Sequence, residues 1–354
     1  MSTNPILLLD GALGTVLEKA PYNILFNENT PLWSSHLLLT HPGVLQAVHG
    51  SYVDAGADII QSATYQASVE RFARTLNPDS PDMDQTYSES EAARYCRSAI
   101  PLARAAFPLQ SQLQNPRHNQ SRLALSLGPY GATMSPITAE YTGLYPSHMD
   151  SVPALGAWHG KRLQIYADNA GTWSGVEYVA FETVLRCDEV LAIRNAMQQV
   201  LSVKGPGPEG KIWWISGIFQ QVDGEDIRHW IEAALGTGNG WPQPWAVVVN
   251  CTRLENAERA VELMEAEVVK LKSSRRPWLV LYPDGTQVEV FDTRTKSWVG
   301  DSELVVKPWA ERCWRVLEEI RRRGVWGGIV VGGCCRTGIE DIKALRGRIE
   351  QSGK

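Results

Sequence analysis

Eight short apolar runs, each followed by a loop and a helical segment, limit the folds open to this chain more than any other feature. The runs are short and bounded by glycine or polar residues, as expected of buried strands. Strands that alternate with helices form a parallel sheet. Eight such units predict a (β/α)₈ TIM barrel, and a doubly wound open sheet is the structural alternative. The expected strands are Ile6–Leu9, Asp58–Ser62, Leu123–Leu127, Glu177–Phe181, Ile212–Ser216, Trp245–Val249, Trp278–Tyr282 and Gly328–Val331.

The composition is that of a chain able to build one large core. Of its 354 residues, 44% are hydrophobic and 21% are charged, and we expect residues 1–354 to form a single barrel domain with surface insertions. The net charge of -5 at pH 7 leaves no basic stripe for a phosphate backbone, so nucleic acid is not an expected partner. No run approaches the length of a membrane span, and the amino-terminal residues lack a signal-peptide pattern. We therefore expect a cytoplasmic protein without a membrane partner.

Two adjacent thiols, Cys334 and Cys335, closely follow the last apolar run, and Cys251 follows the sixth. The carboxyl ends of barrel strands meet around one mouth, so the three thiols are expected to converge there. Zn²⁺ binds about four ligands, and catalytic sites typically take three of them from the protein. We therefore predict a catalytic zinc site, in which Gly332 and Gly333 give the backbone the freedom to turn both sulfurs toward one metal.

Two other interpretations of these residues stay open at this point. A free cysteine is among the most buried residue types and often packs as a small apolar side chain. A glycine pair after the last strand of a barrel could instead hold a phosphate group, which predicts activity without metal. The remaining three of the six cysteines fall in helical stretches and are expected to be inert: Cys96, Cys187 and Cys313.

Polar side chains follow two further expected strands. Asp10 closes the first strand, and Glu182 and Thr183 close the fourth. Two carboxylates that face one mouth could bind an ammonium group, whereas an acid in such a position can also cap a helix or occupy its first turn. Asn250, next to Cys251, is expected to orient the ligand or a substrate carboxylate, or only to satisfy backbone groups.

Three irregular segments lie between the repeated units and are expected to be surface insertions. Residues 107–121 are rich in glutamine and asparagine, and residues 204–210 contain the sequence Gly-Pro-Gly-Pro. Residues 284–301 are expected to form a hairpin around Asp284-Gly285, because this dipeptide is typical of tight turns.

Seven motifs occur in a characteristic order along the chain. They are Leu9-Asp10-Gly11-Ala12-Leu13-Gly14-Thr15, Gln61-Ser62-Ala63-Thr64-Tyr65-Gln66-Ala67-Ser68, Gly128-Pro129-Tyr130-Gly131-Ala132 with Glu140-Tyr141-Thr142-Gly143, Phe181-Glu182-Thr183, Val249-Asn250-Cys251-Thr252, Leu281-Tyr282-Pro283 and Gly332-Gly333-Cys334-Cys335-Arg336-Thr337. Taken together they resemble the homocysteine S-methyltransferase family over nearly the whole chain. The resemblance implies a zinc-bearing (β/α)₈ barrel in which Cys251, Cys334 and Cys335 hold the metal. It also implies that the amino group of homocysteine meets Asp10 and Glu182.

The reaction that this resemblance implies needs such a site. A free thiol with a pKa of about 8.5 is only about 3% ionised at pH 7, so unassisted homocysteine is a weak nucleophile. Zinc removes the thiol proton, and the sulfur can then attack the methyl group of a donor. Members of the family use S-methylmethionine, S-adenosylmethionine, betaine or a methylated folate, and the segment from Tyr65 to Ser68 resembles the branch that uses the first two, which are sulfonium cations. Tyr65 is expected to bind such a cation through its ring, or to pack in the core.

Two other functions remain open from the sequence. A non-catalytic barrel that binds zinc or sulfur amino acids predicts binding without turnover. A methyltransferase that uses betaine or another thiol acceptor predicts turnover with different substrates. In each case the expected partners are small molecules, with homocysteine and a methyl donor foremost, and the sequence predicts no oligomeric state.

Overall fold

The computed structural model describes residues 4–27, 30–78, 80, 85–107, 121–134, 139–204, 211–271, 275–286, 290–292, 297–299 and 308–352. The expected insertions at 107–121 and 204–210 fall largely outside the described residues. Within the described part, eight strands form one sheet in the order β1-β10-β7-β6-β5-β4-β3-β2, with parallel pairing throughout. The strands are β1 (Ile6–Leu8), β2 (Ile59–Gln61), β3 (Arg122–Leu127), β4 (Tyr178–Phe181), β5 (Ile212–Gly217), β6 (Ala246–Asn250), β7 (Trp278–Tyr282) and β10 (Ile329–Val331).

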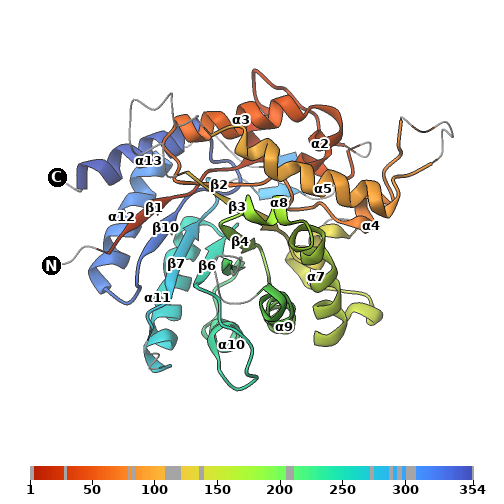
Figure 1. Cartoon of the computed structure of the whole chain (residues 1–354). Coiled ribbons are helices and arrows are strands. Elements are labelled where there is room, and N and C mark those ends of the chain that lie inside the picture. The colour runs from red at the N-terminus through yellow and green to blue at the C-terminus, as the bar shows by residue number, and fades with distance from the viewer. Residues whose placement is uncertain are drawn as a thin grey trace.

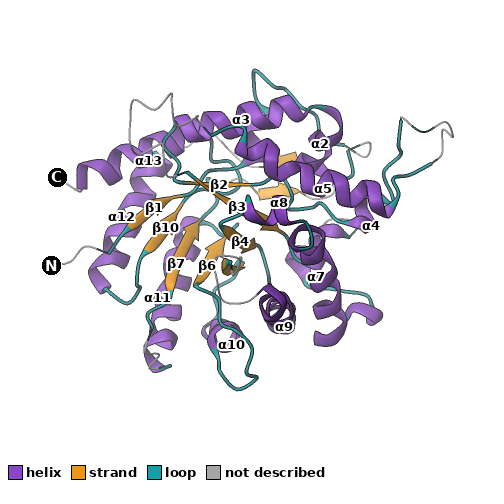
Figure 2. Cartoon of the chain, in the orientation of Figure 1, coloured by secondary structure: helices purple, strands orange, loops and turns teal. Residues whose placement is uncertain are grey.

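The sheet closes on itself because β1 and β2 also meet. The Asp58 N–H donates to the Leu8 carbonyl at 2.7 Å, and the Asp10 N–H donates to the Ile59 carbonyl at 3.1 Å. The strands lie at the centre of the molecule with helices around them, as Figure 2 shows. The predicted (β/α)₈ barrel is confirmed, and a doubly wound sheet is excluded because it would leave two open edges. Each expected strand is present to within one residue at either end.

Helices follow the strands along the chain and cover the outside of the barrel (Figure 1). Short 3₁₀ helices are labelled η. Among the described helices, none is both long enough and apolar enough to cross a membrane. The helices are α1 (Leu13–Glu18), η1 (Trp33–His36), α2 (Leu37–Thr40), α3 (Pro42–Asp54), α4 (Val69–Phe72), α5 (Glu89–Arg104), η4 (Tyr130–Thr133), α6 (Ala139–Thr142), η5 (Ser147–Met149), α7 (Val152–Ala167), α8 (Ala170–Ser174), α9 (Cys187–Lys204), α10 (Gly224–Leu235), α11 (Leu254–Lys270), α12 (Trp309–Arg323) and α13 (Ile339–Ser352).

Apolar side chains on both faces of the strands build two layers of core. In β6, Val247 and Val249 pack toward the helices, whereas Ala246 and Val248 pack inside the barrel. This alternation is the period of two of a strand, and a strand buried on both faces therefore has a nearly continuous apolar sequence. The next inward position of β6 is Asn250. The same alternation turns four further polar residues inward, all of them buried: Ser126, Glu182, Ser216 and Tyr282.

The hairpin expected in residues 284–301 is present, but its turn lies elsewhere. The strands β8 (Val290–Asp292) and β9 (Ser297–Val299) pair antiparallel, so the chain reverses between them and not at Asp284-Gly285. Gly285 instead donates its N–H to the Cys335 carbonyl at 2.7 Å. The predicted position of the turn is wrong, because this contact holds the dipeptide against the loop that follows β10.

Candidate metal centre and active site

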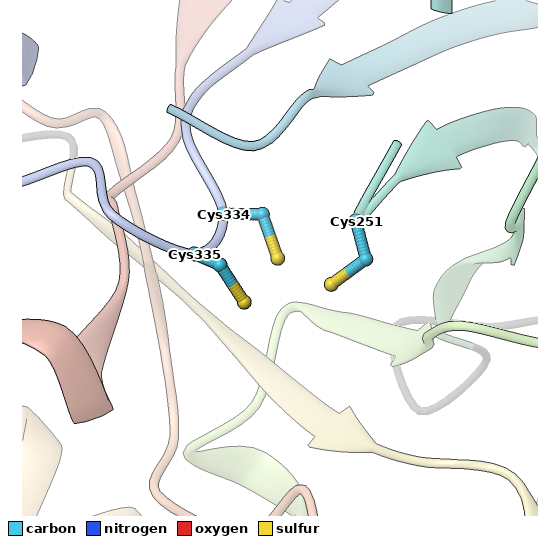
Figure 3. Close-up of side chains that lie close together, drawn as sticks. All are labelled: Cys251, Cys334 and Cys335. Atoms are coloured by element: carbon cyan, nitrogen blue, oxygen red, sulfur yellow. The ribbon is translucent and has the colours of Figure 1, made fainter. Parts of the chain in front are cut away.

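Three thiols converge at the carboxyl ends of β6 and β10, as the sequence predicts. The sulfur atoms of Cys251, Cys334 and Cys335 all lie within 4.8 Å of one another, and Figure 3 shows the three side chains pointing toward a common centre. Tetrahedral zinc with Zn–S bonds of about 2.3 Å separates its sulfurs by about 3.8 Å, so this cluster fits such an ion after small side-chain movements. The three cysteines are neither fully buried nor fully exposed as residues. The cluster could hold a metal ion.

A left-handed backbone turn brings Cys251 into this cluster. Because Asn250 is the last inward residue of β6, strand geometry alone would point the Cys251 side chain toward the helices. Instead Cys251 has a φ of 44°, which few residues other than glycine adopt. The side-chain amide of Gln220 supports this turn by donating to the Cys251 carbonyl at 2.7 Å. Backbone strain of this kind persists only where the surrounding contacts enforce it, and it clusters at functional sites.

Backbone hydrogen bonds fix the cysteine pair against the loop after β7. The Cys334 N–H donates to the Pro283 carbonyl at 3.0 Å, and the Cys335 carbonyl accepts from the Gly285 N–H at 2.7 Å. The next residue, Arg336, has a φ of 67°, so the chain has left strand geometry at this point. Both sulfurs can therefore face one point although they belong to adjacent residues.

Gly332 and Gly333 are needed for space rather than for backbone freedom. Neither has a positive φ, so the prediction that their dihedral freedom turns the pair is wrong. A Cβ on Gly332 would lie 2.6 Å from the Asp10 carbonyl oxygen, and one on Gly333 would lie 2.2 Å from the Thr337 hydroxyl. Contacts this close force atoms to shift. Gly332 lets the loop after β10 pass directly beside the end of β1, and Gly333 lets the same loop fold back against Thr337.

Hydrogen bonds among the thiols favour one negative charge in the cluster. Donation from Cys251, and then from Cys334, lowers the pKa of Cys335 well below its usual range. The same contacts raise the pKa of Cys251, whose thiol stays protonated. The cluster therefore attracts positive charge, and a metal cation would take the place of the shared protons. Three sulfur ligands are a set that zinc accepts in proteins.

Two buried carboxyl groups lie at the same end of the barrel. Asp10 is 3% exposed and Glu182 is 6% exposed. Oδ2 of Asp10 accepts from the Gln61 N–H at 2.8 Å, whereas Oδ1 is buried and has no hydrogen-bond partner among the described residues. Glu182 accepts from the Ser126 hydroxyl, and also from the Tyr282 hydroxyl at 3.1 Å. The sequence predicts the two acids at this end of the barrel, but it gives no sign of the hydroxyl groups that bind Glu182.

The electrostatics of these acids favour a positively charged ligand. Burial raises the pKa of Asp10 well above its usual range, and repulsion from Glu182 raises it further. Burial also raises the pKa of Glu182. A cation nearby has the opposite effect, since it stabilises the ionised form. An ammonium group would supply both the opposite charge and the hydrogen bond that Oδ1 of Asp10 lacks.

Thr183 and Asn250 bind each other across the ends of β4 and β6. The Asn250 side-chain oxygen accepts from the Thr183 N–H at 3.2 Å and from the Ser216 hydroxyl, and its amide donates to the Thr183 hydroxyl at 2.9 Å. Thr183 has a φ of 62°. Asn250 thus satisfies the backbone N–H and the hydroxyl of Thr183, which like Cys251 has a positive φ. Satisfying backbone groups is one of the two roles expected for Asn250.

Tyr65 lies in the loop after β2 and contacts Glu140, an acid that is not among the site residues expected from the sequence. Its hydroxyl donates to Oε2 of Glu140 at 2.6 Å. Glu140 is 5% exposed, and burial, together with the negative charge of Cys335, raises its pKa to about 7. The two partners are 75 positions apart in the sequence. One sequence feature could have indicated a role for Glu140. It belongs to the motif Glu140–Gly143, which is part of the family resemblance.

Arg162 on α7 binds the loop that carries Tyr65. This side chain is 3% exposed and donates to the carbonyls of Ala67 at 3.0 Å, Gly128 at 2.7 Å, Thr64 at 3.0 Å and Tyr65 at 2.7 Å. It thereby ties the loop after β2 to the end of β3. Nothing in the sequence distinguishes Arg162 from an arginine on the exposed face of a helix.

Comparison with known proteins identifies the family of this chain. A family model described as homocysteine S-methyltransferase matches residues 7–349. The chain is 29% identical to homocysteine S-methyltransferase 2 of Arabidopsis thaliana, over 98% of this chain and 94% of that protein. It is 28% identical to a selenocysteine Se-methyltransferase of Brassica oleracea var. italica, over 98% of this chain and 90% of that protein.

A solved structure adds to these relatives. The metallated form of the homocysteine methyltransferase MmuM from Escherichia coli is 28% identical to this chain, with a TM-score of 0.66, over 97% of this chain and 96% of that one. The family model covers the barrel strands and both cysteine motifs. The resemblance expected from the motifs is therefore confirmed, and the chain belongs to the homocysteine S-methyltransferase family.

Proposed function

We propose that this protein transfers a methyl group from a sulfonium donor, S-methylmethionine or S-adenosylmethionine, to the thiol of L-homocysteine, which gives methionine. Zn²⁺ held by Cys251, Cys334 and Cys335 is the proposed cofactor. The observation that carries the proposal is the convergence of three sulfurs within 4.8 Å of one another. A ligand set of three thiolates leaves the fourth position of a tetrahedral zinc ion for a substrate thiol.

The chemistry follows from the charges of the two substrates. When bound, the zinc ion would lower the pKa of the homocysteine thiol, so that the acceptor sulfur is ionised near neutral pH. The acceptor sulfur supplies the electron pair of the new S–C bond, and the pair of the broken S–C bond stays on the donor sulfur, which becomes a neutral thioether. Positive donor and negative acceptor lose their charges together, so a site that aligns them favours the transfer. Asp10 and Glu182 fix the acceptor by binding its ammonium group.

Methionine formation from homocysteine tests the proposal, with S-methylmethionine and S-adenosylmethionine offered separately and metal measured on the same sample. We expect product from at least one of these donors at about one zinc per chain. Chelation should abolish product, and added zinc should restore it. Bound zinc without product from either donor would contradict the proposal and favour a non-catalytic binding barrel. Parallel assays with betaine as donor test the alternative methyl donor. Assays with selenocysteine as acceptor test the alternative acceptor, because one relative is named as a selenocysteine Se-methyltransferase.

Asp10→Asn is expected to raise the KM for homocysteine by about 10- to 100-fold with a smaller change in kcat, because a charge-assisted hydrogen bond is lost. Glu182→Gln should act in the same direction. Steady-state kinetics with homocysteine varied at saturating donor measure the effect. The control is Asp58→Asn, since Asp58 lies before β2 at the opposite end of the barrel, where it accepts from the Leu8 N–H and pairs with Arg346. A homocysteine KM unchanged in both site variants would remove the role assigned to these acids.

A further inference from the structure

The two proposed substrates are both amino acids, and the mouth of the barrel offers more than one acidic position. Asp10 and Glu182 lie at strand ends and interact with each other. A third buried acid, Glu140, lies in α6, within the loop that leaves β3. Its charge interacts with that of Cys335. One thiol cluster is thus flanked by two separate acidic positions, and two substrates each carry an α-ammonium group.

The surroundings of Glu140 orient its carboxyl group without neutralising it. The Tyr65 hydroxyl donates to Oε2 at 2.6 Å. Arg71 favours the ionised form, but it donates its Nη2 to the carbonyls of Ala132 and Met134, at 3.2 Å and 2.8 Å. Among the described residues Glu140 forms no ion pair. A buried carboxylate without an ion-pair partner favours a cationic ligand.

The geometry of methyl transfer separates the amino-acid ends of the two substrates. The acceptor sulfur, the methyl carbon and the donor sulfur lie in line at transfer, with the attacking sulfur about 3–3.5 Å from the carbon beforehand. Asp10 and Glu182 take the ammonium group of the acceptor at the strand ends. The donor lies beyond the methyl group, so its own ammonium group needs a different partner, supplied by the loops that surround the thiols.

We propose that Glu140, oriented by Tyr65, binds the α-ammonium group of the sulfonium donor and so selects donors that carry an amino-acid end. This inference rests on the proposed function and names a residue for its second substrate. The ammonium group keeps its charge during the reaction whereas the sulfonium loses its own. A carboxylate on the ammonium group therefore strengthens donor binding without opposing the chemical step. Betaine has no N–H on its nitrogen and offers no hydrogen bond to this position.

Two matched donors isolate the ammonium group. 4-(Dimethylsulfonio)butanoate has the sulfonium centre, the carbon chain and the carboxylate of S-methylmethionine but lacks the α-amino group. Glu140→Gln is expected to lower kcat/KM for S-methylmethionine by about 10- to 100-fold, and for 4-(dimethylsulfonio)butanoate by less than about 3-fold, with the homocysteine KM unchanged. Tyr65→Phe keeps the carboxylate but removes the group that orients it, and should give the same difference between donors with a smaller loss, about 3- to 10-fold.

Asp284→Asn is the matched control. Asp284 is buried after β7 and its charge also interacts with Cys335, but its carboxylate accepts from the N–H and hydroxyl of Thr286 at 3.1 Å and 2.5 Å. If a negative charge near the thiols acts only through the thiol cluster, Asp284→Asn and Glu140→Gln will each change kcat/KM by the same factor for both donors. We expect a loss of kcat/KM that is selective for S-methylmethionine in Glu140→Gln and not in Asp284→Asn.

Calorimetric titration of each donor into the homocysteine-free protein makes the same comparison without turnover. We expect Glu140→Gln to weaken binding of S-methylmethionine by about 10-fold or more and to leave the affinity for 4-(dimethylsulfonio)butanoate nearly unchanged. Equal losses for both donors, or a raised homocysteine KM, would overturn the inference while the proposed function stands. If the zinc-loaded wild-type protein transfers a methyl group from neither sulfonium compound, the proposed function fails and this inference fails with it.

Discussion

Changing Cys335 to serine is expected to remove metal from the protein and to lower methyl transfer by more than about 100-fold. Loss of a group that merely supports a metal ligand typically costs about 10- to 100-fold in affinity or activity, and loss of the ligand itself should cost more. Without the metal, only about 3% of the acceptor thiol is ionised at pH 7. Elemental analysis and steady-state kinetics on the same sample measure both effects. Cys251→Ser and Cys334→Ser should behave alike.

Cys187→Ser is the matched control for these variants. Cys187 is also half-buried, but it is the first residue of α9 and lies outside the thiol cluster. This variant should keep the metal content and turnover of the wild type. Wild-type turnover in any of the three cluster variants would contradict the assignment of the metal ligands.

Arg162→Met is expected to lower the free energy of unfolding by about 3–5 kcal/mol, because four buried carbonyls lose a charged donor and methionine can replace none of these hydrogen bonds. The loss should be visible in urea unfolding of the metal-free protein. The loop after β2 should also loosen, since three of the four carbonyls belong to its residues Thr64, Tyr65 and Ala67. We therefore expect the KM for the sulfonium donor to rise as well.

Arg194→Met separates these two consequences. Arg194 is 0% exposed and likewise donates to four carbonyls, which belong to the end of α10 and the loop before β6. It should cost a similar free energy of unfolding and leave the donor KM unchanged. Equal donor KM values in the Arg162 and Arg194 variants would show that the loop after β2 is positioned by other contacts.

The strands and the thiol cluster could be predicted because their signals are local. A short apolar run bounded by glycine or polar residues identifies a strand, and barrel geometry brings residues that follow different strands to one mouth. The period of two then places Asn250 inside the barrel. No local signal shows that Cys251 must leave the strand in a left-handed conformation to join the other two thiols, since that turn is supported by Gln220 from another loop.

The remaining site residues depend on contacts between distant parts of the chain. Glu140 becomes part of the site through Tyr65, and Arg162 through carbonyls of two other loops. The sequence around each of them is like that of an exposed acid or base. Their burial and their hydrogen-bond partners therefore follow only from the three-dimensional structure. The misplaced hairpin turn has the same cause. Asp284-Gly285 has the composition of a tight turn, and the contact of Gly285 with the loop after β10 decides its conformation.

The place of β10 in the barrel bears on how the protein matures. This strand is the last of the barrel in the chain, yet it pairs with β1 on one side and β7 on the other. Until it inserts, β1 and β7 have exposed edges, and Cys251 has neither of its partner thiols nearby. Ring closure and completion of the thiol cluster therefore depend on the same contacts between the two ends of the sequence. An incompletely synthesised chain that ends before β10 would have only one of the three thiols of the cluster.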